Sequence, residues 1–410
     1  MARPDRRQAL DHVVAVLFEN RSFDNLLGRL YEPGEVPSFE GVIGKDLSNP
    51  IPEWAEDGAG RGRVPYGVAP TMDTPNPDPG EGYQHINTQL FGIIDPPENR
   101  GVLAEKMAAP YNAPADPGRT PTMDGFVADY ISAFTAELGC QPNYEEYAQI
   151  MTGYTPEQLP VLSTLARGFA TFDHWFCEVP SQTFTNRSFF NAGTASGFVV
   201  NADPGAKLYD AVRSSSSETG SNAYNTLFLV SFDEAGGTYD HVPPPPAPPP
   251  DPAAPARQYG FRFDRSGVRI PAIAISAWTA ERTVVNDQHR STSVLHTLRE
   301  RWSLGKPFSA REAIAPDLSP VLSLETPRDP QDWPEVHPRP VPAFDVALVP
   351  PDLPLRGLPR AMFFAFLGFG KKLGQPVPDV SPDASVTGAE GLAIIHEVFG
   401  HMFPNLRPEG

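Results

Sequence analysis

Cysteine is scarce in this sequence. The 410 residues include only Cys140 and Cys177, which is too few for a disulfide framework or a four-thiolate zinc site. One bridge or two free thiols are the remaining arrangements, and we expect two free thiols, as in a reducing compartment.

Long apolar runs are also lacking. No stretch of about 18 apolar residues occurs, so we expect no membrane-spanning helix. Arg6 and Arg7 resemble a twin-arginine signal, but neither an apolar helical segment nor a small-residue cleavage site follows them. We therefore expect a cytoplasmic protein.

Basic residues are few. The chain has 32 Lys and Arg against 50 Asp and Glu, a net charge of −18. This charge argues against nucleic acid or an anionic membrane surface as a general partner. An anionic substrate is still compatible with it, because a bound metal ion reverses the local field of an acidic pocket.

Proline, in contrast, is abundant. The 49 prolines are about 12% of the chain against a usual ~5%, which predicts long loops. We expect mostly loop over residues 41–122, with one short helix near 99–108. Residues 243–255 hold nine prolines and predict a polyproline II strip, either a surface loop or a docking site for a proline-reading partner.

Apolar runs at residues 12–18, 226–232 and 269–277 predict strands, the first of them buried on both faces. Helical patterns at residues 156–167 and 291–302 lie between or after them. Alternating strands and helices favour an α/β fold with a mostly parallel central sheet flanked by helices.

The C-terminal part has a different composition. Residues 326–357 are rich in proline, and two helices are predicted at residues 359–373 and 387–403. The second begins with a capping box formed by Thr387 and Glu390. We expect residues 321–410 to form a helical extension that packs on a core of residues 8–320.

Acidic residues, one of them next to an asparagine, follow two of the predicted strands. Glu19 and Asn20 come after the first strand, and Asp233 and Glu234 come after the second. Ligands of α/β sheets gather at the carboxyl ends of the strands. Carboxylates that share one crevice there repel each other unless a cation lies between them, so the pattern predicts a metal site.

Five stretches of sequence, in order, resemble a known family. The chain is similar to the phosphoesterase family that includes bacterial phospholipases C and acid phosphatase A type enzymes, within the alkaline-phosphatase-like superfamily. The resemblance covers roughly residues 10–320. The stretches are ENRSFDNLLG from Glu19, MDGF from Met123, FDHWFCEVPSQTFTNR from Phe172, FDEAGGTYDHVPPP from Phe232 and RIPAIAISAW from Arg269.

The resemblance implies a metal-dependent phosphoric ester hydrolase that forms a phospho-enzyme. Thr183 falls at the position of the nucleophile, where metal coordination would favour its alkoxide. Asn186, Arg187 and His241 would complete the catalytic set. One divalent ion would be held by Glu19, Asn20, Thr183, Asp233 and Glu234, and the substrate would be a small phosphate ester or a phospholipid head group. Some relatives in the family are secreted.

Several of these residues have simpler interpretations. Thr183 could cap a helix over residues 186–192, and Arg187 could form a surface salt bridge. Asp240 and His241 could stabilise a loop instead of acting in catalysis. His174 is interpreted as a structural, hydrogen-bonded histidine, and His85 is a further residue that could reach the site.

The chain departs from the family pattern at positions that normally hold histidine. Where the family has the histidine of its D-E-H-G-G motif, this chain has Ala235. The histidines of the family motifs H-T-S and D-P-G-H are replaced here by Ser291 and Glu81. The connection over residues 197–226 is also short, since the family usually has more than a hundred residues there. General-acid assistance to the leaving group, worth about 10²–10⁴ in rate, would be reduced.

Two other functions compete with the hydrolase. One is a non-catalytic binding or scaffold protein that retains the metal site and docks through its proline strip. The other is a related phosphonate or sulfate ester hydrolase, although Cys177 lacks the C-x-P-x-R context of a typical sulfatase.

Overall fold

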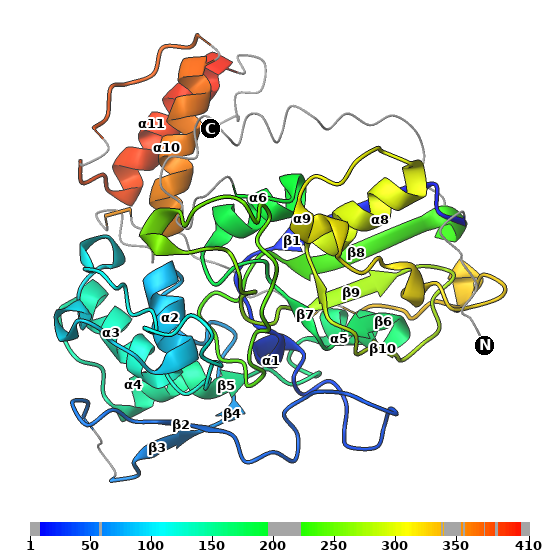
Figure 1. Cartoon of the computed structure of the whole chain (residues 1–410), viewed down its shortest axis with the longest axis horizontal. Helices are drawn as coiled ribbons and strands as arrows, with labels where there is room; N and C mark the ends of the chain where they lie inside the picture. Colours follow the sequence, from blue (N-terminus) through cyan, green and yellow to red (C-terminus); the bar gives the residue numbers. More distant parts are fainter. Residues whose placement is uncertain are drawn as a thin grey trace. The chain divides into compact units, whose positions relative to one another are not determined.

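The computed structural model describes residues 9–56, 60–195, 223–337, 339, 354–355, 357–372, 374–381 and 384–402. The chain divides into two compact units (Figure 1). The first comprises Met1–Val200 and Thr219–Pro338, and the second comprises Asn201–Glu218 and Arg339–Gly410. The short connection predicted at residues 197–226 lies almost entirely outside the described residues.

A five-stranded sheet forms the centre of the first unit, as expected for an α/β fold. Its strand order is β1-β8-β9-β6-β10. β1 pairs with β8, and β6 with β10, in parallel, whereas β9 is antiparallel to both of its neighbours. Four strands therefore run in one direction, so the sheet is mostly parallel. The strands are β1 (His12–Phe18), β8 (Thr226–Phe232), β9 (Ala272–Ile275), β6 (Ala170–Phe172) and β10 (Thr283–Val285).

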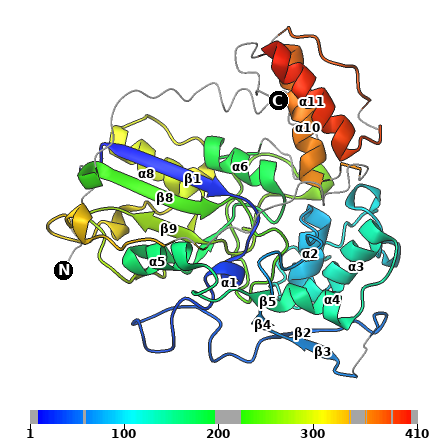
Figure 2. The same ribbon diagram turned by 180° about the vertical axis from the view of Figure 1, so that it is seen from behind.

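The first strand is less buried than its sequence predicts. β1 has the expected bounds, but it lies at the edge of the sheet (Figure 2). The side chains of Val14, Val16 and Phe18 are 43%, 37% and 50% exposed. The prediction that β1 is buried on both faces is therefore wrong. A short apolar run has the same pattern in an edge strand and in an interior strand, and here β8 rather than β1 is interior.

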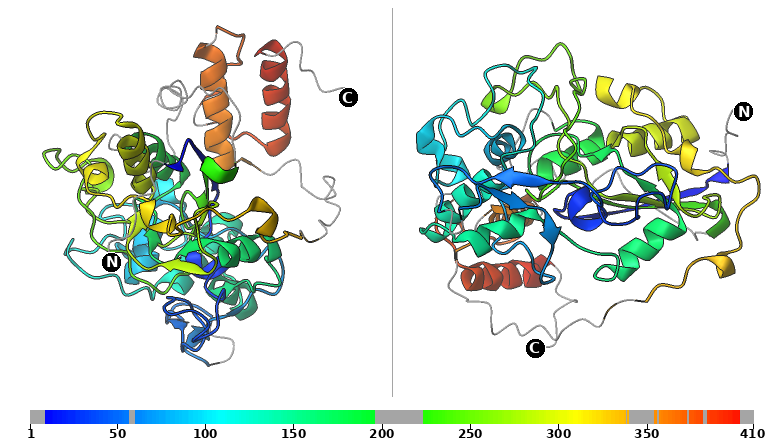
Figure 3. Two further views of the ribbon diagram at one scale, coloured as in Figure 1. Left: turned by 90° about the vertical axis from the view of Figure 1, so that its right-hand side faces the viewer. Right: turned by 90° about the horizontal axis from the view of Figure 1, so that it is seen from below.

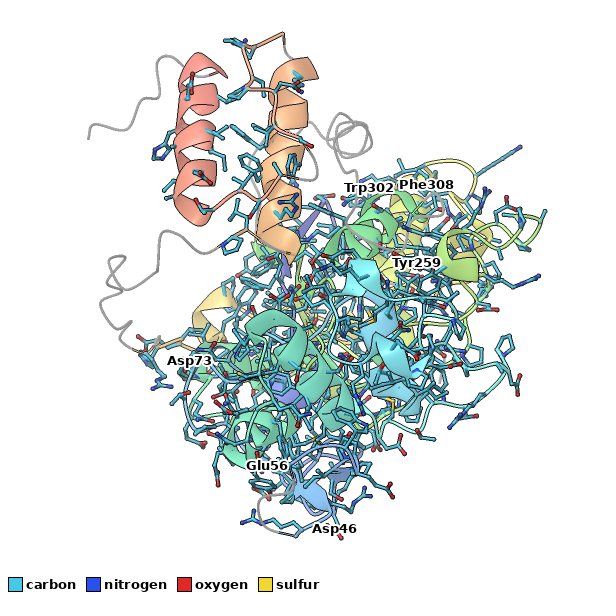
Figure 4. All side chains as sticks on the ribbon, turned by 90° about the vertical axis from the view of Figure 1, so that its left-hand side faces the viewer. Asp46, Glu56, Asp73, Tyr259, Trp302 and Phe308 are labelled. Carbon is cyan, nitrogen blue, oxygen red and sulfur yellow. The ribbon has the colours of Figure 1, made fainter. Side chains whose placement is uncertain are left out.

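Helices cover both faces of the sheet. Seen from below, α8 (Thr292–Trp302) lies on one face and α5 (Pro160–Gly168) on the other (Figure 3). Both helices lie close to their predicted positions. Trp302, the last residue of α8, and Phe308 are partly exposed at the surface of this unit (Figure 4).

Residues 41–122 are mostly loop, as expected, with short strands, the helix α2 and 3₁₀ turns among the described residues. α2 contacts α3, and α3 contacts β2 and α4. The prediction of a single helix near residues 99–108 is wrong, because two separate 3₁₀ turns occupy Pro97–Asn99 and Ala104–Lys106. The elements within residues 41–122 are β2 (Ser48–Pro50), β3 (Arg63–Pro65), β4 (Gly67–Val68) and α2 (Tyr83–Phe91), and those that follow are α3 (Phe126–Leu138), α4 (Tyr144–Ala148) and β5 (Thr152–Gly153).

The second unit contains the two helices predicted near the C-terminus, α10 (Gly357–Lys372) and α11 (Gly388–Met402). The capping box is present: Thr387 Oγ1 accepts from the Glu390 backbone N–H, and the Thr387 N–H donates to Glu390. Phe363, Leu367, Val386 and Val398 form this unit's buried cluster. Over the part of the chain that the structure describes, every helix is too short or too polar to span a membrane.

Both cysteines are free thiols, as predicted. Cys140, which follows α3, is exposed, whereas Cys177 is buried. Cys177 lies just after β7 (Trp175–Phe176), which pairs with β11 (His289–Arg290).

Candidate active site

The hydroxyl of Thr183 lies at the carboxyl end of the sheet. Thr183 is the first residue of α6 (Thr183–Ala192), and the cap position is taken by Gln182 without a side-chain cap hydrogen bond. The buried Thr183 hydroxyl instead donates to Oδ1 of Asn20 at 3.4 Å. The structure therefore does not show Thr183 as the capping residue of the helix.

Asn20 joins three separate segments. It follows β1 with a φ of 62°, a left-handed conformation that asparagine tolerates better than most residues. Its backbone N–H donates to Oδ1 of Asp233 at 3.3 Å, and its side-chain Nδ2 donates to Oε1 of Glu81 at 2.6 Å. Asn20 thus contacts α6 through Thr183, the end of β8 and the loop before α2.

The Gly236–Gly237 turn allows these segments to approach closely. Both glycines have positive φ, 58° and 66°. A Cβ on Gly236 would overlap the backbone of Asn20, and a Cβ on Gly237 would overlap the carbonyl oxygen of Gly80. The turn therefore requires glycine for both its backbone conformation and its close packing.

Asp233 and Arg187 form an ion pair within this cluster. Arg187 Nε donates to Asp233 Oδ2 at 2.9 Å, and its Nη2 donates to Glu19 Oε1 at 3.4 Å. Asp233 is fully buried, whereas the Arg187 side chain is 31% exposed. Arg187 therefore links the acidic residues that follow β1 and β8 and reaches solvent from there.

Three carboxyl groups of the cluster have raised pKa values. Burial raises the pKa of Glu234 well above its usual value, and the charges of Glu81 and Asp233 raise it further. Burial is also the main reason that the pKa of Asp233 rises to about 6 and that of Glu81 to about 7, the latter with help from Asp78. All three groups are thus in surroundings that disfavour the uncompensated anion.

The residues around Asn20 fit a divalent cation. Glu234 is 1% exposed, its Oε2 accepts from the Gly236 N–H, and its Oε1 has no hydrogen-bond partner among the described residues. A buried carboxylate oxygen without a partner is costly unless a cation or a proton compensates it. The other available donors are also oxygens, which suit a hard divalent ion.

The side chain of Asn186 forms hydrogen bonds to backbone groups rather than facing a phosphate site. Its Oδ1 accepts from the Val179 N–H, and its Nδ2 donates to the carbonyl groups of Val179, Ser181 and Gln182. These bonds hold the loop that leads into α6. The structure thus gives Asn186 a role in placing Thr183, and its direct catalytic role stays a prediction.

His241 belongs to a second, separate network. Its Nδ1 lies 2.6 Å from Asp24 Oδ2, and its Nε2 lies 2.9 Å from Glu40 Oε1. The buried Arg269 donates to Asp24 and Asp240 at 2.8 and 2.9 Å. Burial alone would lower the pKa of His241, but the hydrogen bond and charge of Asp24 raise it overall. These contacts match the loop-stabilising interpretation, and catalysis by His241 stays a prediction.

The same network has the spacing of a metal site. Ligand atoms of Asp24, Asp240 and His241 lie within 4.8 Å of one another. However, the Arg269 guanidinium already donates to both carboxylates and supplies the compensating charge. We therefore place the metal candidate at Asn20 rather than here.

Two other histidines considered from the sequence are hydrogen-bonded within the fold. His174 Nδ1 lies 2.8 Å from Asp173 Oδ1, in line with the structural role expected for it. His85 Nδ1 lies 2.8 Å from Asp129 Oδ1. The residue that sequence reasoning missed is Glu81, because the family pattern that located the other residues has histidine at its position.

The sequence model of the phosphoesterase family matches residues 10–222 and 205–305 of this chain. The chain belongs to the phosphoesterase family. It is accordingly a hydrolase of phosphoric ester bonds.

Curated relatives of this phosphoesterase include plant and bacterial proteins. Non-specific phospholipase C6 of Arabidopsis thaliana is 25% identical over 434 residues, covering 80% of this chain and 75% of the relative. Non-specific phospholipase C3 of the same plant is 26% identical and covers 77% and 74%. Phospholipase C A of Mycobacterium tuberculosis is 32% identical over 114 residues, 25% of this chain and 22% of the relative.

The first of these alignments includes gaps in this chain. Four-fifths of its 410 residues is about 328, fewer than the 434 aligned positions. About a hundred positions of that relative therefore have no counterpart in this phosphoesterase, which is the shorter of the two over the aligned region.

Proposed function

We propose that this phosphoesterase is a metal-dependent hydrolase of the phospholipase C type, with Thr183 as its nucleophile. The observation that carries the proposal is the contact between the Thr183 hydroxyl and Oδ1 of Asn20. It joins the start of α6 to the carboxyl end of β1, where the Asn20 N–H also meets Asp233. We also propose that the fold is of the alkaline-phosphatase-like type.

The residues of the chain divide the work of phosphoryl transfer. Thr183 Oγ1 forms a bond to phosphorus as the phosphorus–oxygen bond to the alcohol breaks, and the alcohol leaves with a proton. Water then cleaves the bond between phosphorus and Thr183 Oγ1, which releases the phosphate with the head group that it carries and returns a proton to the Thr183 oxygen. A divalent cation held by Glu19, Asn20, Thr183, Asp233 and Glu234 would lower the pKa of the attacking hydroxyl and offset charge on the phosphoryl oxygens.

Two features near Thr183 favour an anionic substrate. α6 begins at Thr183 and has ten residues, so its N-terminal dipole favours negative charge next to the nucleophile. The Arg187 guanidinium, partly exposed beside Asp233, could donate to a non-bridging phosphate oxygen. Both features act on the phosphoryl group, whatever alcohol it carries.

The names of the relatives favour a phospholipid as the substrate, and the missing histidines predict which esters react well. With Ala235 and Ser291 at positions where the family pattern has histidine, proton donation to the leaving group is reduced. We therefore expect faster turnover of esters with acidic leaving groups, such as p-nitrophenyl phosphorylcholine, than of alkyl phosphates.

The test compares two isosteric variants of neighbouring threonines. Thr183→Val removes the proposed nucleophile, whereas Thr185→Val removes a buried hydroxyl that has no hydrogen-bond partner among the described residues. We expect Thr183→Val to abolish hydrolysis of p-nitrophenyl phosphorylcholine and Thr185→Val to retain it. Wild-type turnover in Thr183→Val would remove the covalent mechanism. A folded wild-type protein that hydrolyses no ester with any divalent cation would favour the non-catalytic alternative.

A further inference from the structure

The side-chain amide of Asn20 has two ends of nearly equal shape and opposite chemistry. Oδ1 accepts hydrogen bonds and can bind a cation, whereas Nδ2 donates hydrogen bonds and repels a cation. Oδ1 faces Thr183, and Nδ2 faces Glu81. A rotation of this amide by half a turn would place Nδ2 against the proposed nucleophile and cation, so its orientation matters for the site.

The partner of Nδ2 determines that orientation. Glu81 Oε1 accepts from Nδ2, so the reversed amide would set the Asn20 oxygen against this acceptor oxygen. The distance between Asn20 Nδ2 and Glu81 Oε1 is 2.6 Å, against 3.4 Å between the Thr183 hydroxyl and Asn20 Oδ1, so the contact with Glu81 is the shorter of the two contacts that the amide makes. A histidine, which stands here in the family pattern, could donate or accept and would specify the amide less strictly.

Glu81 is itself held by close packing of the preceding residue. A Cβ on Gly80 would overlap the ring of His85, and the Gly80 carbonyl oxygen lies against Gly237. Gln89 Nε2 donates to that carbonyl at 2.7 Å and to Asp129 at 2.8 Å.

The same Asp129 also binds His85, at 2.8 Å. The two helices α2 and α3, which carry these side chains, therefore fix the backbone from which Glu81 extends.

We propose that Glu81 is a positioning residue that holds the amide of Asn20 with its oxygen toward Thr183 and the cation. The inference rests on the proposed function, because it concerns the same site. Glu81 acts through Asn20: its carboxylate takes up the donor end of the amide and leaves the acceptor end for the ion. The cluster of Glu81, Asn20 and Thr183 is thus a directed series of hydrogen bonds.

The test measures Mn²⁺ binding to the full chain by titration calorimetry, alongside kcat, KM and thermal unfolding. Glu81→Ala removes the acceptor, and we expect Mn²⁺ affinity and kcat to fall about 10- to 100-fold, with KM nearly unchanged. Glu81→Gln keeps an acceptor oxygen but can also donate, so it should lie between wild type and Glu81→Ala.

The control is Asp78→Asn, which removes a negative charge that acts on Glu81 and leaves the bond to Asn20 in place. We expect Asp78→Asn to bind Mn²⁺ within about threefold of wild type. The proposal is overturned if Glu81→Ala binds Mn²⁺ like wild type. It is also overturned if Asp78→Asn or Glu81→Gln is as impaired as Glu81→Ala, because charge alone would then explain the effect.

These outcomes are distinct from failure of the proposed function. If wild-type protein binds no divalent ion, or Thr183→Val stays active, the proposed function fails. If wild type binds Mn²⁺, Thr183→Val is inactive and Glu81→Ala resembles wild type, only the role of Glu81 fails.

Discussion

Thr183 and Asn20 are 163 residues apart in the chain, yet a hydrogen bond of 3.4 Å joins the hydroxyl of one to the amide oxygen of the other. Each residue stands at the end of a regular element. Asn20 follows β1, and Thr183 begins α6. The proposed nucleophile is therefore placed by the sheet and a helix rather than by a loop alone.

The hydroxyl of Thr183 should be required for turnover. We expect Thr183→Val to lower kcat/KM by roughly 10³-fold or more, because the substitution removes the oxygen that we propose attacks phosphorus and changes the side-chain volume little. Mass spectrometry of acid-quenched reactions should detect a phosphorylated peptide containing residue 183 in wild type and in Thr185→Val. A phosphopeptide from Thr183→Val would place the covalent step at another residue.

Neutralising Glu234 should stabilise the protein that has no cation bound. The pKa of Glu234 is raised by burial and by Glu81 and Asp233, so its charge opposes folding when no cation compensates it. We expect Glu234→Gln to unfold at a higher temperature than wild type in the presence of EDTA. Mn²⁺ at about 100 times its Kd should stabilise wild type by ~2.7 kcal/mol and the variant by much less. Equal stabilisation of both would exclude Glu234 from the cation site.

The buried ion pairs of Arg269 should dominate the stability of the loop that follows β8. Arg269 is fully buried between Asp24 and Asp240, so Arg269→Met removes the guanidinium from both carboxylates and leaves Asp24 with its contact to His241. Loss of one partner of a buried pair costs about 3–5 kcal/mol, measurable by urea unfolding. Arg282, whose pair with Glu35 is long and whose side chain is 55% exposed, is the matched control. Arg282→Met should cost less than about 1 kcal/mol, and similar losses in both variants would contradict this view.

His241 should make stability depend on pH. Its pKa in the folded protein is raised overall by Asp24 against the opposing effect of burial. A raised histidine pKa gives stability that is fully present below the unfolded value of about 6.5 and is lost as pH rises through the folded value. The difference in unfolding free energy between wild type and His241→Asn should therefore be largest near pH 5.5 and shrink toward pH 9. A difference that is constant with pH, as expected for Thr185→Val, would show that folding does not change the pKa of His241.

The sequence predicted the elements that carry the site better than it predicted their surroundings. β1 and β8 have the predicted bounds because short apolar runs mark strands directly. The pattern could not tell that β1 is an edge strand, since pairing partners lie far away in the chain. α2 was missed because glycine, proline and asparagine around it favour loop, and its helix is held by tertiary contacts with α3.

The same distinction applies to the site residues. The proposed metal ligands follow strands or occupy family motifs, and such positions can be recognised in the sequence alone. They are Glu19, Asn20, Thr183, Asp233 and Glu234. The partnership of Asn20 with Glu81 spans 61 residues and depends on the close packing of Gly80 and Gly237. No spacing rule relates those residues, so only the folded arrangement could reveal the contact.

The unequal burial of the two thiols has a practical consequence. Since Cys140 is exposed and Cys177 is enclosed, a maleimide dye applied to the native protein should attach at a single known place, just beyond the end of α3. α3 also carries Asp129, which anchors the loop of Glu81 through Gln89. A fluorophore at Cys140 would thus follow this helix during ligand addition in the unaltered sequence, without any engineered cysteine.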